Sequence, residues 1–306
     1  MIALFLLAAL AAAAPNTDLA ALVENGHFKR ARAALPSNPE DASTLALVAK
    51  VALAYKELDT AANFAERAAA REPGNADLQF LLCEVYGTQA QQASIFRQPF
   101  LGRKTKKAMD AALALDPNHV DSLFVLMLYY HMAPGLIGGD KGKAREMPDR
   151  IRALDPPRGW LAEARLAELE KHPERLENLY RQAAAADAKN FPAQLAYARH
   201  LAKEKCAEAQ GPALAAHKLK PDRIEPYAIL ATCAARLGDL AHMEEWLRKS
   251  EAQIPDDLRP HLQAAKALHE ADKEPARAKA LLDKYLSQQP EPTAPSHAEA
   301  RKMFSR

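Results

Sequence analysis

Apolar side chains recur along most of this chain at the spacing of one face of an α-helix. Leu45, Val48, Ala49 and Ala52 follow the i, i+3, i+4, i+7 pattern that predicts an amphipathic helix. The same stripe returns in three later segments, and alanines recur at matching positions of the helices expected to follow: Gln79, Leu82, Cys83 and Tyr86; Leu123, Leu126, Met127 and Tyr130; Tyr227, Leu230, Ala231 and Ala234; Ala61, Ala65, Ala68 and Ala278.

Prolines mark a repeat of about 34 residues, with each first helix expected to begin three residues after its proline. The spacings are 34 (Pro39 to Pro73, Pro221 to Pro255), 35 (Pro255 to Pro290), 44 (Pro73 to Pro117) and 39 (Pro117 to Pro156). Ala188 takes the proline's place between Pro156 and Pro221. A period of 34 is that of a stacked helix–turn–helix unit. The pattern predicts an all-α, right-handed α-solenoid of about seven to eight repeats.

In this register the chain resembles a tetratricopeptide repeat protein over roughly residues 17–289. The resemblance implies a superhelical stack that binds a protein partner in its concave groove. The chain departs from the family in having no tryptophan at the fourth position of any unit, Arg165 at a core position, and Ala188 for proline. We therefore expect residues 157–190 to be the least regular part of the array.

The N-terminus is typical of a cleaved export signal. Residues 2–14 are an apolar run too short to cross a bilayer, and small residues follow it. We expect a signal peptide at 1–13, a solenoid at 14–289 and a tail at 290–306, where Ser296 and Glu299 predict a short capping helix. The alternative for residues 1–13 is an apolar helix packed on the array. No cysteine follows the run, so we expect a periplasmic or secreted protein without a lipid anchor or a transmembrane segment.

The composition gives no sign of nucleic-acid binding or of catalysis. Lys and Arg number 41 against 39 Asp and Glu, so basic stretches are interpreted as solvated helix faces. The ten histidines form no H-E-x-x-H motif, and no nucleophile elbow or phosphate-binding loop occurs. We expect no catalytic residue, metal or cofactor. Cys83 fits a packed core position, and Cys206 and Cys233 either form one bridge or stay free.

The predicted partner-binding surface is the concave groove, lined by one face of each first helix. Its expected lining is acidic and aromatic in the N-terminal half and more basic in the C-terminal half, a mixture that suits an extended peptide or also simply keeps the groove soluble. The residues assigned to partner binding in the groove are Phe80, Glu84, Phe124, Leu128, His131 and Arg199. Other expected lining residues are Asp77, Asp121, Trp160, Glu163, Leu195, Glu225, Thr232, Arg259, Leu262, Lys266 and His269.

The wide proline steps predict two insertions, at 88–104 and 133–140, between the helices of consecutive repeats. Stacking would place them side by side on one edge, with Phe96, Phe100 and Leu136 as partner-binding residues, joined by Ile95, Leu101 and Ile137. These apolar side chains either form a docking patch or fold back over the groove.

The pattern AP-x-x-x-GG at residues 133–139 resembles exported bacterial tetratricopeptide proteins, including lipoprotein partners of periplasmic solute transporters. That resemblance implies an alternative function, an accessory transport subunit that binds a small apolar ligand in a pore under the insertions. The primary interpretation is a non-enzymatic scaffold or adaptor of the cell envelope that holds a protein or peptide partner.

Overall fold

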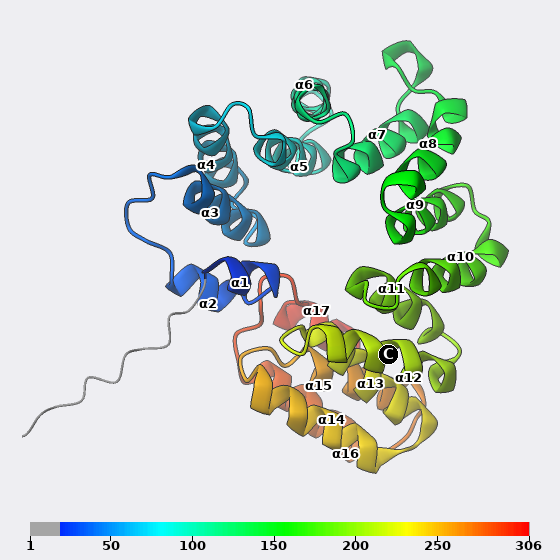
Figure 1. The fold of residues 1–306 in the computed structure, drawn as a ribbon. Helices are drawn as coiled ribbons and strands as arrows, with labels where there is room; N and C mark the ends of the chain where they lie inside the picture. Colours follow the sequence, from blue (N-terminus) through cyan, green and yellow to red (C-terminus); the bar gives the residue numbers. More distant parts are fainter. Residues whose placement is uncertain (1–18, 306) are drawn as a thin grey trace, which may run out of the picture.

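The computed structural model describes residues 19–305, and all regular structure in that range is helical. Consecutive helices pack as eight antiparallel hairpins, and a final helix follows them (Figure 1). This arrangement confirms the predicted all-α solenoid. The helices are α1 (Leu19–Glu24), α2 (Phe28–Ala33), α3 (Ala42–Ala54), α4 (Leu58–Arg71), α5 (Ala76–Gln92), α6 (Gln98–Leu115), α7 (Val120–Met132), η1 (Gly135–Ile137), α8 (Lys141–Leu154), α9 (Pro156–Leu169), α10 (Pro173–Ala186), α11 (Phe191–Leu201), α12 (Cys206–Leu219), α13 (Ile224–Leu237), α14 (Leu240–Gln253), α15 (Arg259–Glu270), α16 (Pro275–Leu286) and α17 (His297–Lys302).

The apolar stripes predicted from the sequence form the core between hairpins. Leu45 and Ala49 of α3 are buried against Ala61, Ala65 and Ala68 of α4, which are completely buried. Alanine at these positions lets the two helix backbones approach closely, so one hairpin buries its inner surface with little side-chain volume. Further along, the same role falls to Leu123 and Met127, to Leu230 and Ala234, and to Ala278 and Leu281.

The first helix of most hairpins begins three residues after the proline that marks the repeat, or after the residue in its place. This holds for Pro39, Pro73 and Pro117, and also for Ala188, which therefore marks a regular repeat. Two first helices differ. Helix α15 begins four residues after Pro255, and Pro156 is the first residue of α9 itself, where Asp155 caps the helix by accepting from the backbone N–H of Arg158.

The expectation of an irregular stretch at residues 157–190 is wrong. Helix α9 begins at its proline, three residues early, yet Ala162 and Leu166 are buried at positions where the repeat register expects core residues. Arg165 is exposed and pairs with Glu168. Helices α9 and α10 have 14 residues each and pack as a regular hairpin.

The largest excess of residues lies in the hairpin α5–α6. The first residues of α5 and α7, Ala76 and Val120, are 44 positions apart, whereas those of α7 and α9 are 36 apart. Residues 88–104 were expected to form a loop, but α5 continues to Gln92 and α6 begins at Gln98. The insertion therefore lengthens two helices, to 17 and 18 residues, while the neighbouring α7 has 13. Residues 133–140 do connect α7 to α8, with η1 in the middle.

Five hairpin turns share one backbone geometry. In each, one residue has a positive φ angle, and the next amide N–H donates to the carbonyl five residues earlier, as in a Schellman motif. Glycine occupies this position in two of the turns, and Gly238 has a φ of +78°. The residues with positive φ in these turns are Gly26, Lys56, Lys171, Gly238 and Asp272.

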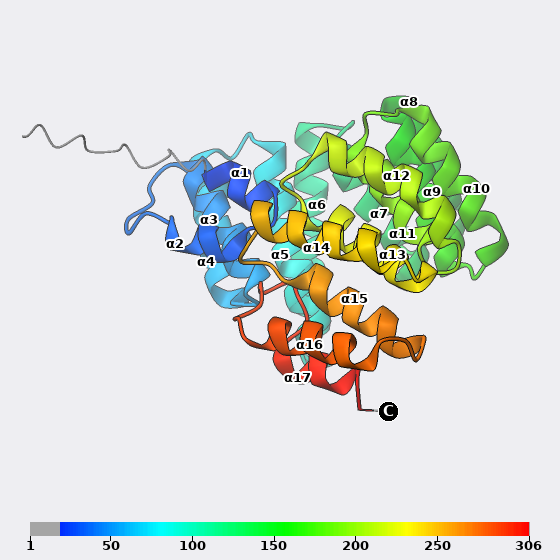
Figure 2. The same cartoon turned by 90° about the horizontal axis from the view of Figure 1, so that it is seen from below.

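The stack curves until its two ends meet. In Figure 1 the helices follow a ring that brings α1 and α2 next to the C-terminal repeats. Figure 2 shows that α16 and α17 lie on a different level from α1, so the chain describes about one superhelical turn. Contacts that join residues more than 190 positions apart hold the ends together, and we call this region the seam.

The seam is polar, in contrast to the apolar interfaces between hairpins. Arg30 of α2 donates to both carboxylate oxygens of Asp256, one of them at 3.0 Å. Lys29 donates through its backbone N–H to Glu291 Oε2 at 3.1 Å and through Nζ to the carbonyl oxygen of Gln289 at 2.7 Å. At the other end of the seam Lys220 pairs with Glu24. Charge-assisted hydrogen bonds therefore close the ring.

The tail runs from the seam to the outer end of the array. Glu291 is buried at the seam, and α17 then packs against α15 and α16. Ser296 and Glu299 form a capping box at the start of α17. The predicted signal peptide at residues 1–13 lies outside the described residues.

We predict that Arg30→Ala loosens the seam. The substitution leaves Asp256 without its guanidinium partner, and a part-buried bidentate pair of this kind is worth roughly 1 kcal/mol. Amide hydrogen exchange in α1 and α2 should accelerate about fivefold, and the radius of gyration from X-ray scattering should rise. Arg32→Ala is the matched control, because Arg32 on the same helix pairs with Glu57 inside the N-terminal hairpins. Equal effects from both substitutions would rule out a closing role for Arg30.

We also predict that the seam weakens as the pH rises from 6.5 to 8. Burial, together with Asp257 and Asp256, raises the pKa of Glu291 from 4.5 to about 7 against the opposing effect of Lys29. The folded protein then binds this proton more tightly than the unfolded chain, so stability falls as pH rises through 7. Burial and Arg30 lower the pKa of His27 below 6.5, so its opposing contribution is confined to lower pH. The charged or titratable groups around Glu291 are Lys29, Tyr55, Asp256, Asp257 and Arg259.

Glu291→Gln tests this assignment, because a neutral side chain still accepts from Lys29 but cannot titrate. The melting temperature of the wild type should fall between pH 6.5 and 8, and that of the variant should change less. Parallel curves for the two proteins would show that Glu291 is not the titrating group.

Candidate functional site

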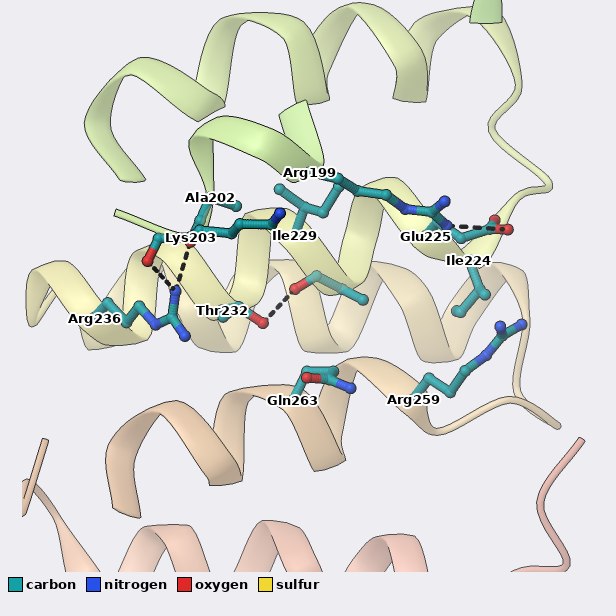
Figure 3. A pocket seen from close by; sticks show the side chains of 11 residues that line it. Arg199, Ala202, Lys203, Ile224, Glu225, Ile229, Thr232, Arg236, Arg259 and Gln263 are labelled. Atoms are coloured by element: carbon teal, nitrogen blue, oxygen red, sulfur yellow. Dashed lines mark hydrogen bonds and ion pairs between the residues drawn. The ribbon is translucent and has the colours of Figure 1, made fainter. Parts of the chain in front are cut away.

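The most distinct hollow on the concave side lies in the C-terminal half of the ring. It has a volume of about 370 Å³ and is built by the first helices of three consecutive hairpins, α11, α13 and α15 (Figure 3). We call it the concave pocket. Its lining residues are Arg199, Ala202, Lys203, Ile224, Glu225, Ala228, Ile229, Thr232, Arg236, Arg259 and Gln263.

The floor of the concave pocket is one face of α13. Ile224, Ala228, Thr232 and Arg236 recur every four residues, so they share one side of the helix. Ile224 and Ile229 are buried in the hairpin core and present only an edge to the hollow. The Thr232 hydroxyl donates to the carbonyl oxygen of Ala228 at 2.6 Å, which satisfies it within the helix. The floor is therefore mainly apolar.

Arg259 is fixed at one end of the concave pocket by a buried carboxylate. Its guanidinium donates to Asp257 at 2.6 to 3.0 Å, and the Asp257 side chain is 2% exposed. Burial opposes the charge of Arg259, but the hydrogen bonds that it donates to Asp257 outweigh burial and raise the pKa of the guanidinium. This arginine is held rigidly and stays charged.

Glu225 is the single acidic residue in the lining, and Arg223 largely neutralises it. The Arg223 guanidinium donates to both Glu225 oxygens, one of them at 3.0 Å. Burial disfavours the ionised carboxylate, but this contact holds the pKa of Glu225 below its usual value. Arg199 reaches the same carboxylate only at 3.8 Å. Its side chain is open to solvent inside the hollow, and partial desolvation there lowers its pKa.

Two further cations stand at the opposite end of the concave pocket. Arg236 donates to the carbonyl oxygen of Ala202 at 2.5 Å and lies 3.6 Å from Glu270. Lys203 is exposed at the rim, and Figure 3 shows it above the floor. Among residues 19–305 no ion pair involves Lys203. Arg199 and Lys203 are therefore the cations with the most unused hydrogen-bonding capacity, and the hollow as a whole suits an anionic group beside an apolar one.

The predicted groove residues of the N-terminal half are mainly used to join repeats. Phe80 stacks on His119 with ring centroids 5.2 Å apart, and His119 also contacts Asp77 at 3.0 Å. One repeat later, Arg158 lies 4.5 Å from the Phe124 ring centroid and pairs with Asp121 at 2.6 Å. In both repeats, an aromatic ring and a carboxylate from one first helix contact a residue at the start of the first helix of the following repeat. Phe80 and Phe124 are half-buried as a result.

The other predicted groove residues have mixed positions. Leu128 is half-buried against the core, and His131 is half-buried. Glu84 is exposed on α5, and partial desolvation raises its pKa. Leu195 and Leu262 are buried, so the expectation that they line the groove is wrong. Both leucine side chains pack against neighbouring helices. The buried face of α11 and of α15 is wider than the four core positions that the repeat register assigns to each helix.

The insertion edge exposes large apolar side chains. Leu136 is 99% exposed, Phe96 92% and Phe100 55%, and Ile95 and Ile137 are also exposed. They therefore do not fold back over the groove. Leu101, which the sequence grouped with them, is buried because it begins the core face of α6. The partner-binding role of Phe96, Phe100 and Leu136 stays a prediction.

Residues 19–305 contain no cluster of three or more metal-binding side chains and no helix long and apolar enough to span a membrane. All three cysteines are buried and free. Cys206 and Cys233 are neighbours, and burial, followed by the interaction of the Cys233 thiol with Cys206, raises the pKa of Cys233. Burial likewise raises the pKa of Cys83 to about 12, so this thiol is not a reactive nucleophile.

Sequence reasoning found Arg199, Glu225, Thr232 and Arg259 but missed the residues that complete the concave pocket. Arg236 was overlooked because the groove positions were assigned by family register and stopped at Thr232. The four-residue spacing from Ile224 to Arg236 was the available signal. The other missed residues are Ala202, Lys203, Ile224, Ala228, Ile229 and Gln263.

No protein-family model matches this sequence, and no curated protein matches it. Several solved helical-repeat structures are similar in fold. The type IV pilus biogenesis factor PilW is 14% identical, with 70% of this chain and 94% of PilW covered and a TM-score of 0.42. TTC0263, a tetratricopeptide repeat protein of Thermus thermophilus, is 16% identical, with 74% and 98% covered and a TM-score of 0.41. Yeast Tom70 is 15% identical, with 89% and 64% covered and a TM-score of 0.49. We draw no functional inference from likenesses this distant.

Proposed function

We propose that this protein is a non-enzymatic scaffold that holds an acidic segment of a partner protein in the concave pocket. One observation supports the proposal above others: three consecutive hairpins place four cations around an apolar floor. An Asp or Glu side chain, or a chain terminus, would accept hydrogen bonds from Arg199 and Lys203. A neighbouring apolar side chain would lie on the face of α13.

The fixed cations of the concave pocket would attract an acidic partner, and the less constrained Arg199 would reorient to bind its carboxylate. Arg259 is held by Asp257 and Arg236 by backbone carbonyl groups, so these cations provide a fixed positive field. Arg199 has only a long contact to Glu225 and can turn toward an incoming carboxylate. Preorganised charges lower the cost of ordering the site when the partner binds.

We further propose that the protein works in the cell envelope, because residues 1–13 have the features of an export signal. Intact-mass measurement of the protein purified from cells should give a mature chain beginning near Ala14. A mass that retains Met1 would contradict export. The insertion edge, with Phe96 and Phe100, stays a predicted second contact for the partner.

We predict that reversing the charges of Arg199 and Lys203 reduces crosslinking of a partner in the concave pocket. A photoreactive amino acid at Thr232 should crosslink to a partner in cells, and Arg199→Glu with Lys203→Glu should reduce that crosslink about tenfold or more. The crosslinked partner peptide, mapped by mass spectrometry, should be rich in Asp and Glu.

The matched control is Arg181→Glu with Lys189→Glu, which reverses two exposed cations near α10 outside the concave pocket. This variant should crosslink like the wild type. Equal crosslinking by all three proteins, or a partner peptide that is basic, would rule out the proposed site. Circular dichroism of each variant checks that the helices are intact.

A further inference from the structure

The largest hollow described in the molecule lies at the insertion edge, away from the concave pocket. It has a volume of about 550 Å³ and lies between the extended hairpin α5–α6 and the end of α7 with η1. We call it the edge cavity. Volumes of this size are typical of small-molecule sites. Its lining residues are Gly87, Ala90, Gln98, Pro99, Gly102, Arg103, Thr105, Lys106, Met109, Val125, Tyr129 and Ile137.

The edge cavity arises from a mismatch in helix length. Helices α5 and α6 have 17 and 18 residues, but the next first helix, α7, has 13. At 1.5 Å per residue, α5 extends about 6 Å further than α7. The extra turns have no neighbouring helix to cover them, and the inner faces of Gly87, Ala90 and Gly102 are too small to fill the space. Met109 closes the inner end.

Residues 133–140, which we call the roof, contribute Ile137 to the wall of the edge cavity. Tyr129 of α7 donates its hydroxyl to the carbonyl oxygen of Ile137, which ties η1 to the helix. Gly139 allows the tight return of the chain, because a Cβ there would lie 1.7 Å from the carbonyl oxygen of Ala133. The roof is thus a fixed part of the fold, and only its tip, with Leu136, projects into solvent.

The polar atoms of the wall are turned away from the edge cavity. The Thr105 hydroxyl donates to the carbonyl oxygen of Leu101 at 2.9 Å, so its methyl group faces Gly87. The Gln98 amide donates to the carbonyl oxygen of Ala93 at 3.2 Å. With the Tyr129 hydroxyl also occupied, the wall offers apolar surface and almost no unused donor or acceptor. Such a space takes an apolar molecule in preference to water.

Positive charge is concentrated at the mouth. From residue 93 to 109 the chain has five basic side chains and no acidic one. Two of them line the edge cavity, and Lys106 is already paired with Asp110 at 2.5 Å on the same helix. Arg103 is exposed and forms no ion pair within residues 19–305. The mouth can therefore neutralise one anionic group while the interior accepts a chain without charges.

We propose that the edge cavity binds a single-chain anionic amphiphile, with the hydrocarbon chain inside and the acidic head group on Arg103. The ligand class follows from the apolar wall and the single unpaired cation at the mouth. A free fatty acid and an anionic lipid drawn from a bilayer share this chemistry. Phe96 and Leu136 are exposed and lie close in sequence to the lining residues Gln98 and Ile137, which favours contact with a lipid surface as the route of entry. This proposal does not depend on the concave pocket.

The test uses the mature full-length protein and tetradecanoate, with binding measured by displacement of 11-(dansylamino)undecanoate fluorescence. Tetradecanoate should displace the probe, and tetradecyltrimethylammonium, with a matched chain and the opposite charge, should do so at least about tenfold more weakly. Equal displacement by both would contradict recognition of the head group.

Gly102→Leu should abolish binding by filling the edge cavity, because a Cβ at Gly102 meets no atom within 4 Å and the substitution also favours the helix. Gly211→Leu is the matched control, since Gly211 is an exposed helical glycine on α12 with the same free space. It should bind like the wild type. Similar loss in both variants, or retention in both, would rule out the edge cavity as the site.

Arg103→Glu should weaken tetradecanoate binding about tenfold while leaving that of tetradecanol, which has the same chain, nearly unchanged. Equal weakening of both ligands would contradict a head-group role. Gel filtration after incubation with phosphatidylglycerol vesicles distinguishes the sources. Lipid that remains bound to the protein, as shown by native mass spectrometry, supports extraction from a bilayer. Binding of tetradecanoate alone supports a free acid, and binding of neither overturns the proposal.

Discussion

The shape of this protein depends on a polar contact between its two ends. Between hairpins the interfaces are apolar and rich in alanine, so each hairpin needs only its neighbours. At the seam, by contrast, Lys29 and Arg30 meet Asp256 and the buried Glu291 across more than 220 residues. A contact made of charges and directed hydrogen bonds is specific in geometry and sensitive to salt and pH. It fixes how far the stack can curve, and with it the relative positions of α11, α13 and α15 around the concave pocket.

The closed seam also changes how the array should unfold. A linear repeat protein has two free ends, from which helices can separate one hairpin at a time. Here α2 contacts the loop before α15 and the chain after α16, and Glu24 at the end of α1 contacts the loop before α13. Each end therefore acts as the cap of the other. Loss of the seam would lower the stability of both ends at once, although they are far apart in sequence.

The hairpins could be predicted from sequence because their contacts are local. Proline and its replacement Ala188 precede first helices by three residues, and stripes such as Leu45 to Ala52 define the buried face. Pro156 misled the register because a proline is equally suited to the first turn of a helix. The seam was not predictable, since it depends on the summed curvature of eight hairpins.

The concave pocket was found in part, through Arg199, Glu225 and Arg259, while Arg236 needed the actual helix phase. For the edge cavity, the sequence predicted only where the extra residues lie along the chain. It did not predict that these residues lengthen two helices and so leave a cavity.

The hairpin α5–α6 differs from the others by about one added turn on each helix. Because a full turn returns a helix to nearly the same phase, both buried faces stay aligned with their neighbours while the ends project beyond them. A repeat protein can in this way gain an internal space without disturbing the stacking of any other unit. The same extension, made in a hairpin of a designed array together with a short roof segment, offers a modular route to a side pocket whose size is set by the number of turns added.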